Sequence, residues 1–169
     1  IPLCRQACYY CDFHFSTYFG IKTEIVNALK KELLIQKSYL GTKKIDTIYF
    51  GGGTPSVLST DDLESLIDII FKTFDVRKDP EITIEANPDD LILTKTKELK
   101  TLGFNRLSIG IQSFNDEILK YLNRNHNSED SFKAIKNAEK AGFENINLDL
   151  IFAIRENYID VLKDDIEKF

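Results

Sequence analysis

The stretch LGFNRL at residues 102–107 has a near copy, AGFENI, at residues 141–146, and each joins an expected helix to an expected strand. Each glycine is expected to end its helix in a left-handed conformation, with the following phenylalanine packing back on the helix. Repeated strand and helix units of this kind predict a parallel β-sheet with helices on its outside.

The same alternation extends from these two joints toward both ends of the chain. Helices are expected over residues 21–40, from Ser59 or Thr60 to 71, and over 89–102, 128–141 and 158–169, with strands over 45–50, 81–86, 106–111 and 146–152. With a strand just before Cys4, the chain holds about five βα units, whereas a complete eight-unit barrel uses about 250 residues. The expected fold class is therefore α/β, as an open, partial barrel. Periodicity alone leaves a flat, doubly wound sheet as the alternative.

Composition and charge exclude several classes of protein. The chain has 169 residues, of which 43% are hydrophobic and 29% charged, which is typical of one globular core. A net charge of −5 argues against nucleic acid and anionic membranes as partners. No apolar run reaches the roughly 20 residues of a membrane span, and no signal peptide is visible.

The only cysteines form one C-x3-C-x2-C run, Cys4, Cys8 and Cys11. Three thiolates on a short loop can converge on one soft metal centre. A disulfide would leave one thiol over and close a very short, strained loop. Zinc is the main competitor, because His14 would complete a Cys3His site. An iron–sulfur cluster would keep one iron without a protein ligand, open to a substrate or cofactor.

Polar and glycine residues follow the expected strands, where ligands bind in both α/β architectures. The glycines at 51–53 would let backbone N–H groups approach a polar ligand, although a tight βα turn explains them equally well. Glu85 and Asp149 interrupt runs that should be buried, so each needs a ligand or an internal ion pair. Arg124 and His126 lie in a polar stretch that side-chain chemistry alone interprets as a solvated loop.

Together these motifs resemble the radical S-adenosylmethionine (SAM) superfamily. The motifs are the cysteine run with Tyr10 before its last cysteine, GGGTP at 51–55, EANP at 85–88, GIQSF at 110–114 and NRNH at 123–126. More narrowly, the chain is similar to the oxygen-independent coproporphyrinogen III oxidase-like group. The resemblance implies a partial (β/α)6 barrel. It makes residues 1–169 an incomplete core domain, without the start of its N-terminal strand, its last βα unit and a C-terminal domain.

The resemblance also implies the cofactors. A [4Fe–4S] cluster would be held by Cys4, Cys8 and Cys11, and its fourth iron would be chelated by SAM, which one electron cleaves to methionine and a 5′-deoxyadenosyl radical. The electron would come from a donor such as flavodoxin or ferredoxin. No catalytic side chain is implied. The implied SAM-binding residues are Tyr10, Gly52, Gly53, Thr54, Glu85, Gln112, Arg124 and Asp149, with Gly52, Gly53 and Thr54 facing the amino group, Arg124 the carboxylate, and Glu85, Gln112 and Asp149 the remaining polar groups.

Within the group, Phe13 stands where the true oxidases carry a further cysteine, so the chain resembles the HemW haem-chaperone branch. That branch implies bound haem, a haem-acceptor protein as partner, and His126 as a haem-associated residue. Leu122 departs from the branch, where a fuller motif has histidine, and residues 153–156 depart from the usual Gly-x-Pro-Gly of the adenine side. Reduced thiols and oxygen-sensitive iron predict a cytoplasmic location. Coproporphyrinogen oxidation remains the alternative activity.

Overall fold

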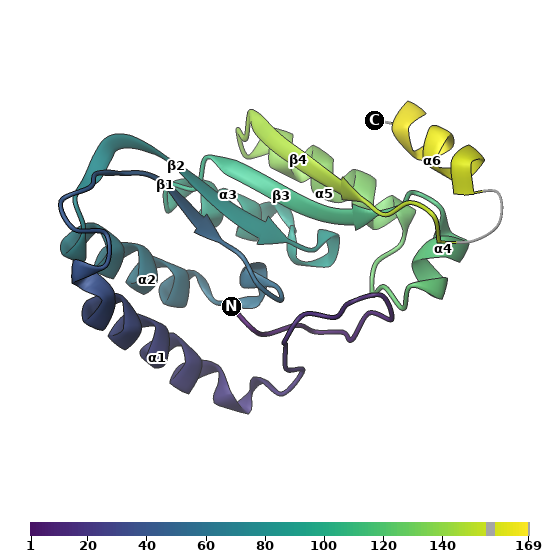
Figure 1. Cartoon of the computed structure of the whole chain (residues 1–169). Helices are drawn as coiled ribbons and strands as arrows, with labels where there is room; N and C mark the ends of the chain where they lie inside the picture. Colours follow the sequence, from purple (N-terminus) through teal and green to yellow (C-terminus); the bar gives the residue numbers. More distant parts are fainter. Residues whose placement is uncertain (155–157, 169) are drawn as a thin grey trace.

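The computed structural model describes residues 1–154 and 158–168, and its centre is one parallel sheet (Figure 1). The sheet holds β1 (Ile45–Phe50), β2 (Val76–Ala86), β3 (Arg106–Gln112) and β4 (Asn145–Leu150), in that order across the sheet. Every neighbouring pair is parallel. The predicted α/β class with a parallel sheet is therefore confirmed.

Four helices lie together on one face of the sheet (Figure 1). They are α1 (Lys22–Ile35), α2 (Thr60–Thr73), α3 (Leu93–Thr101) and α5 (Ser128–Lys140). Two further helices, α4 (Asp116–Tyr121) and α6 (Tyr158–Glu167), lie near the ends of β3 and β4. Short 3-10 turns cover Phe19–Ile21, Gln36–Ser38, Pro55–Val57 and Pro88–Asp90.

The two glycine joints have the predicted conformation. Gly103 and Gly142 have φ angles of +97° and +86°. The N–H groups of Phe104 and Phe143 donate to carbonyls five residues earlier, which is the pattern of a Schellman cap. Both phenylalanine rings are buried in the core, so each joint fixes where the next strand begins.

Element boundaries differ from the expected ones at several places. β2 begins at Val76 rather than at the expected Glu81. Its register against β1 shifts between these two residues, in a segment that includes Pro80. The short helix α4 had no counterpart in the predicted elements. The strand expected before Cys4 takes the form of an isolated bridge between Leu3 and Ser16. Pro2 has no amide hydrogen with which to extend a ladder.

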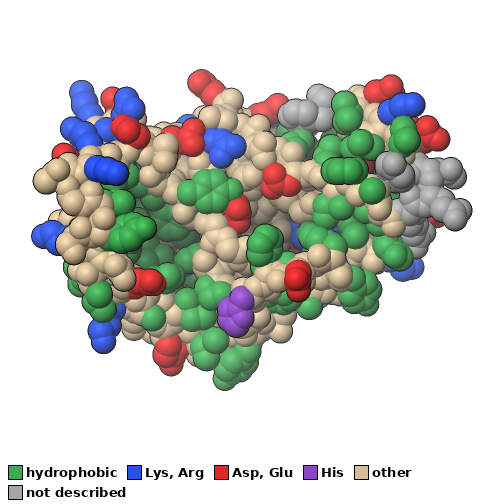
Figure 2. Space-filling view, in the orientation of Figure 1, with side chains coloured by type: hydrophobic (Ala, Val, Ile, Leu, Met, Phe, Trp, Pro, Cys, Tyr) green, Lys and Arg blue, Asp and Glu red, His purple; other side chains and the backbone are tan. Residues whose placement is uncertain are grey.

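The two faces of the sheet differ in chemistry. The face toward the helices carries core residues such as Ile84, Leu107 and Ile109. The opposite face carries Tyr49, Glu85 and Asp149, which have hydrogen-bond partners there. Acidic side chains, in red, are visible on the face shown in Figure 2. Parallel sheets are usually apolar on both faces, so a polar face suits a polar ligand or water. Within the described residues, no helix is long and apolar enough to cross a membrane.

Candidate functional site

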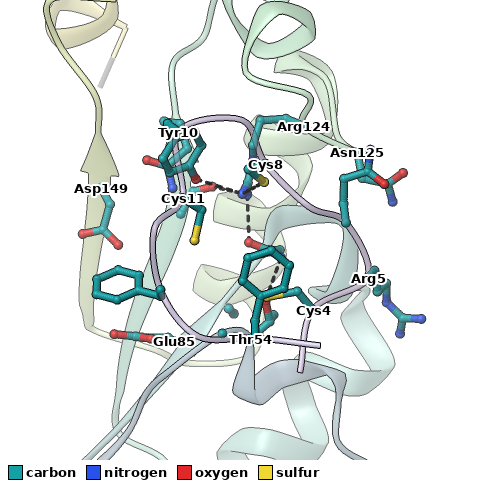
Figure 3. Close-up of a pocket in the computed structure, with 18 of the residues that line it drawn as sticks. Cys4, Arg5, Cys8, Tyr10, Cys11, Thr54, Glu85, Arg124, Asn125 and Asp149 are labelled. Atoms are coloured by element: carbon teal, nitrogen blue, oxygen red, sulfur yellow. Dashed lines mark hydrogen bonds between the residues drawn. The ribbon is translucent and has the colours of Figure 1, made fainter. Parts of the chain in front are cut away.

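A cavity of about 360 Å³ lies at the carboxyl ends of the strands and is also lined by the N-terminal cysteine loop. This size falls in the range of small-molecule sites. Figure 3 shows that side chains as far apart in the sequence as Cys4 and Asp149 lie around it. Its lining includes the predicted residues Cys4, Cys8, Tyr10, Cys11, Gly52, Gly53, Thr54, Glu85, Gln112, Arg124 and Asp149.

The three cysteines lie on one loop at this cavity (Figure 3). Cys4 is buried, and its sulfur accepts a hydrogen bond of 3.2 Å from the Thr54 hydroxyl. Burial raises the pKa of the Cys4 thiol. Cys8 and Cys11 are partly exposed, and the Cys11 amide donates to the Cys8 carbonyl. This turn brings Cys8 and Cys11 together, and all three thiols line the same cavity.

The donor set fits an iron–sulfur cluster better than a single ion. Among the described residues, no three His, Cys, Asp or Glu side chains are close enough together to hold one metal ion. His14, the expected fourth zinc ligand, is exposed and does not line the cavity. In a cluster each cysteine binds a different iron, so the thiolates do not have to meet at one point.

The glycine loop after β1 lies directly against the cysteine loop. A Cβ added to Gly53 would lie 2.8 Å from the Cys4 sulfur and 2.9 Å from the Leu3 carbonyl oxygen. Gly52 has a φ of +127°, which side chains rarely adopt, and its N–H donates to Glu85. The loop therefore needs glycine both for close approach and for backbone conformation.

The two carboxylates on the polar face are held by neutral donors. Glu85 accepts hydrogen bonds from the Tyr49 hydroxyl, at 2.8 Å, and from the Gly52 amide. Asp149 accepts from Ser108 at 3.2 Å and from Asn147 at 2.8 Å. Neither carboxylate has an ion pair with a described Lys or Arg, so the described part of the chain does not form the internal ion pair considered from the sequence.

Arg124 has the most hydrogen bonds of the cavity side chains. Its Nη2 donates to Asn87 Oδ1 at 2.8 Å and to the Gly110 carbonyl at 2.9 Å. Its Nη1 donates to the Tyr10 hydroxyl at 3.2 Å and to the Cys8 sulfur at 3.4 Å. Burial raises the pKa of Tyr10 to about 12. The interpretation of Arg124 as part of a solvated loop was wrong, because its guanidinium points into the cavity (Figure 3).

His126 occupies a different environment from Arg124. It is 4% exposed, its Nε2 lies 3.1 Å from the Ile111 carbonyl oxygen, and it does not line the cavity. Burial lowers the pKa of His126 to about 4. The solvated-loop interpretation was wrong here too. A haem role for His126 stays a prediction, and this burial argues for packing instead.

Sequence reasoning did not single out Tyr49, Ser108 and Asn147, although their side chains position the two carboxylates. Their signal was the period-two alternation of polar residues along β1, β3 and β4, which puts them on one face of the sheet. Residues 153–156 differ from the Gly-x-Pro-Gly that is usual on the adenine side. Of these, Arg155 and Glu156 lie outside the described residues.

The chain is similar in sequence to several known proteins. Residues 1–167 match the Radical SAM superfamily. The chain is 40% identical over 169 residues to the "Heme chaperone HemW" of Lactococcus lactis subsp. lactis (strain IL1403), covering 100% of this chain and 44% of the relative. It is 42% identical over 158 residues to the protein of the same name from Bacillus subtilis (strain 168), covering 91% of this chain and 41% of the relative.

A solved structure extends the similarity to the fold. The chain superimposes on coproporphyrinogen III oxidase (HemN) from Escherichia coli, described as a radical SAM enzyme, with a TM-score of 0.88 and 28% identity. The match covers 99% of this chain and 39% of that chain. The sheet is therefore part of a radical SAM barrel, and the flat doubly wound alternative is wrong. The chain spans less than half the length of these relatives.

Proposed function

Because this chain belongs to the radical SAM superfamily, we propose that it binds a [4Fe–4S] cluster through Cys4, Cys8 and Cys11, and SAM in the adjoining cavity. The observation that carries the proposal is the shared cavity. Three thiols, a glycine loop and the Arg124 guanidinium line it together, although they come from distant parts of the sequence. When bound, the cluster would supply one electron to SAM and so generate a carbon radical.

The residues of this chain would bind and orient SAM. Thr54 and the glycine loop offer polar groups for an amino acid head group, and Arg124 offers a positive charge for a carboxylate. Glu85 and Asp149 each still have acceptor capacity toward the cavity, which suits ribose hydroxyls. Gln112, in the left-handed region at φ +70°, ends β3 at the same cavity.

For the whole protein we propose a haem chaperone that passes haem to an acceptor protein in the cytoplasm. Support comes from the two HemW relatives at 40% and 42% identity. A flavodoxin or ferredoxin is the proposed electron donor. Anaerobic oxidation of coproporphyrinogen III is the second candidate, favoured by the structural similarity to HemN.

The cofactor proposal is tested by anaerobic reconstitution of the chain with iron and sulfide. The expected result is a brown protein with about four iron and four sulfide per chain, and a SAM-dependent change in the spectrum of the reduced cluster. The matched control is Cys8→Ala, which removes one thiolate and is expected to lose stable cluster binding. One zinc per chain without sulfide would reject the proposal. So would a full iron and sulfide content in Cys8→Ala.

A further inference from the structure

Two hydrogen bonds, one on each side of Cys8, join the cysteine loop to a distant turn. The side-chain amide of Asn123 donates to the Ala7 carbonyl at 2.7 Å. The Tyr9 amide donates to the Leu122 carbonyl at 3.1 Å. The residues immediately before and after Cys8 are therefore tied to the carboxyl end of α4.

Asn123 stands at a backbone position that usually takes glycine. Its φ is +60°, and the Arg124 amide donates to the Leu119 carbonyl, so the turn ends α4 as a Schellman-type cap. Glycine would form this turn with no side-chain strain. The asparagine adds an amide that reaches the cysteine loop, which the turn itself does not need.

The same turn also aims Arg124. Directly after Asn123, the chain leaves the left-handed position, and the Arg124 guanidinium reaches Cys8 and Tyr10. Figure 3 shows this guanidinium between those two side chains. One short turn thus controls the backbone on both sides of Cys8 and the cation that contacts its sulfur.

We propose that Asn123 is a positioning residue that holds the cysteine loop in the shape needed to bind the cluster before the cluster arrives. This inference rests on the proposed cluster binding. Asn123 is not itself a ligand. Its amide fixes the Ala7 carbonyl. The backbone bond from Tyr9 to Leu122 holds the other side of Cys8, so the two bonds together set the direction in which Cys8 points.

The variant Asn123→Gly distinguishes the effect of the side-chain amide from the effect of the turn. Glycine keeps the positive φ and removes only the side chain. Asn123→Asp keeps the shape but turns an acceptor toward the Ala7 carbonyl. The matched control is Asn115→Ala. Asn115 caps the other end of α4 by accepting from Glu117 and Ile118, so its loss weakens α4 without touching the cysteine loop.

The first measurement uses the cluster-free chain. Hydrogen exchange of the Tyr9 amide is expected to be about threefold to tenfold faster in Asn123→Gly than in wild type, since one net hydrogen bond is lost. In Asn123→Asp, the Tyr9 amide should exchange at least as fast as in Asn123→Gly. In Asn115→Ala, the Tyr9 amide should exchange at the wild-type rate. Equal rates in wild type and Asn123→Gly, or equal acceleration in Asn115→Ala, would overturn the proposal.

The second measurement uses the reconstituted protein and follows iron release to a chelator. Asn123→Gly is expected to release iron about threefold to tenfold faster, while Asn115→Ala releases it at the wild-type rate. Release from Asn123→Gly at the wild-type rate would also overturn the proposal. A wild-type chain that takes up no cluster would reject the proposed function. The Tyr9 exchange rate would then decide the positioning role alone.

Discussion

At the scale of single residues, the burial of His126 makes the stability of the fold depend on pH. Its pKa of about 4 lies below the ordinary value of 6.5 because burial disfavours the charged ring. Below pH 6.5 the unfolded chain binds a proton that the folded chain does not bind until about pH 4. The stability contributed by the neutral ring is therefore complete above pH 6.5 and is lost as the pH falls toward 4.

Wild type is expected to lose up to about 3 kcal/mol of unfolding free energy through this residue between pH 6.5 and 4. His126→Gln keeps an amide donor that can reach the Ile111 carbonyl and does not titrate, so it should lack this component. Urea unfolding of both proteins at pH 7.5, 6 and 4.5 measures the difference. Parallel stability curves would contradict the assignment of the pH dependence to His126.

Arg124 illustrates why one cation cannot replace another at this cavity. A guanidinium can donate at once to Asn87, Gly110, Tyr10 and Cys8, whereas an ammonium cannot reach all four groups. Arg124→Lys is therefore expected to weaken SAM binding by about tenfold or more. Anaerobic calorimetry with the reconstituted protein measures the affinity. Arg106→Gln is the control, because Arg106 lies at the start of β3 and outside the cavity.

At the scale of elements, two glycines serve different purposes. A Cβ at Gly103 would meet only Ile82 at 3.9 Å, so Gly103→Ala is expected to cost about 1–2 kcal/mol through its positive φ alone. A Cβ at Gly53 would instead press on Leu3 backbone and the Cys4 sulfur. Gly53→Ala is therefore expected to lower the cluster content. Gly103→Ala is expected to lower only the unfolding free energy. Iron analysis and urea unfolding of both variants distinguish the two effects, and full cluster content in Gly53→Ala would contradict this account.

The elements also show how far the sequence could predict the fold and the site. The strand at 45–50 and the caps at Gly103 and Gly142 follow from local residue chemistry, and each was predicted. The short helix α4 is held by its Asn115 cap and by packing of Ile118 and Leu119, which no periodicity within six residues reveals. The bonds of Arg124 to Asn87 and Cys8 join positions far apart in the chain, so its place in the cavity required the fold.

At the scale of the whole molecule, the described sheet leaves its polar face open. Its C-terminal edge forms the cavity, and apolar residues of α1 and β1 line a separate groove beside it, visible as a hollow in Figure 2. The chain spans less than half of its HemW relatives.

Phe13 decides the last prediction. It lines the cavity and is 76% exposed, so an apolar ring stands where the resemblance to the oxidases would require a thiol. Removing two carboxyl groups from a porphyrinogen also requires a site that excludes water around the radical. A protein containing this chain at the full length of its relatives is therefore expected to bind haem and SAM without converting coproporphyrinogen III to protoporphyrinogen IX.

The measurement is an anaerobic assay with reduced cluster, SAM and coproporphyrinogen III, with the Escherichia coli oxidase as positive control, alongside haem titration of the same preparation. His126→Ala tests the remaining haem prediction. Because the ring is buried against Ile111 rather than in the cavity, unchanged haem affinity is expected after stability is matched. Sustained decarboxylation by the wild-type protein would defeat the chaperone proposal. A large loss of haem affinity in His126→Ala would show instead that the ring leaves its buried position to bind iron.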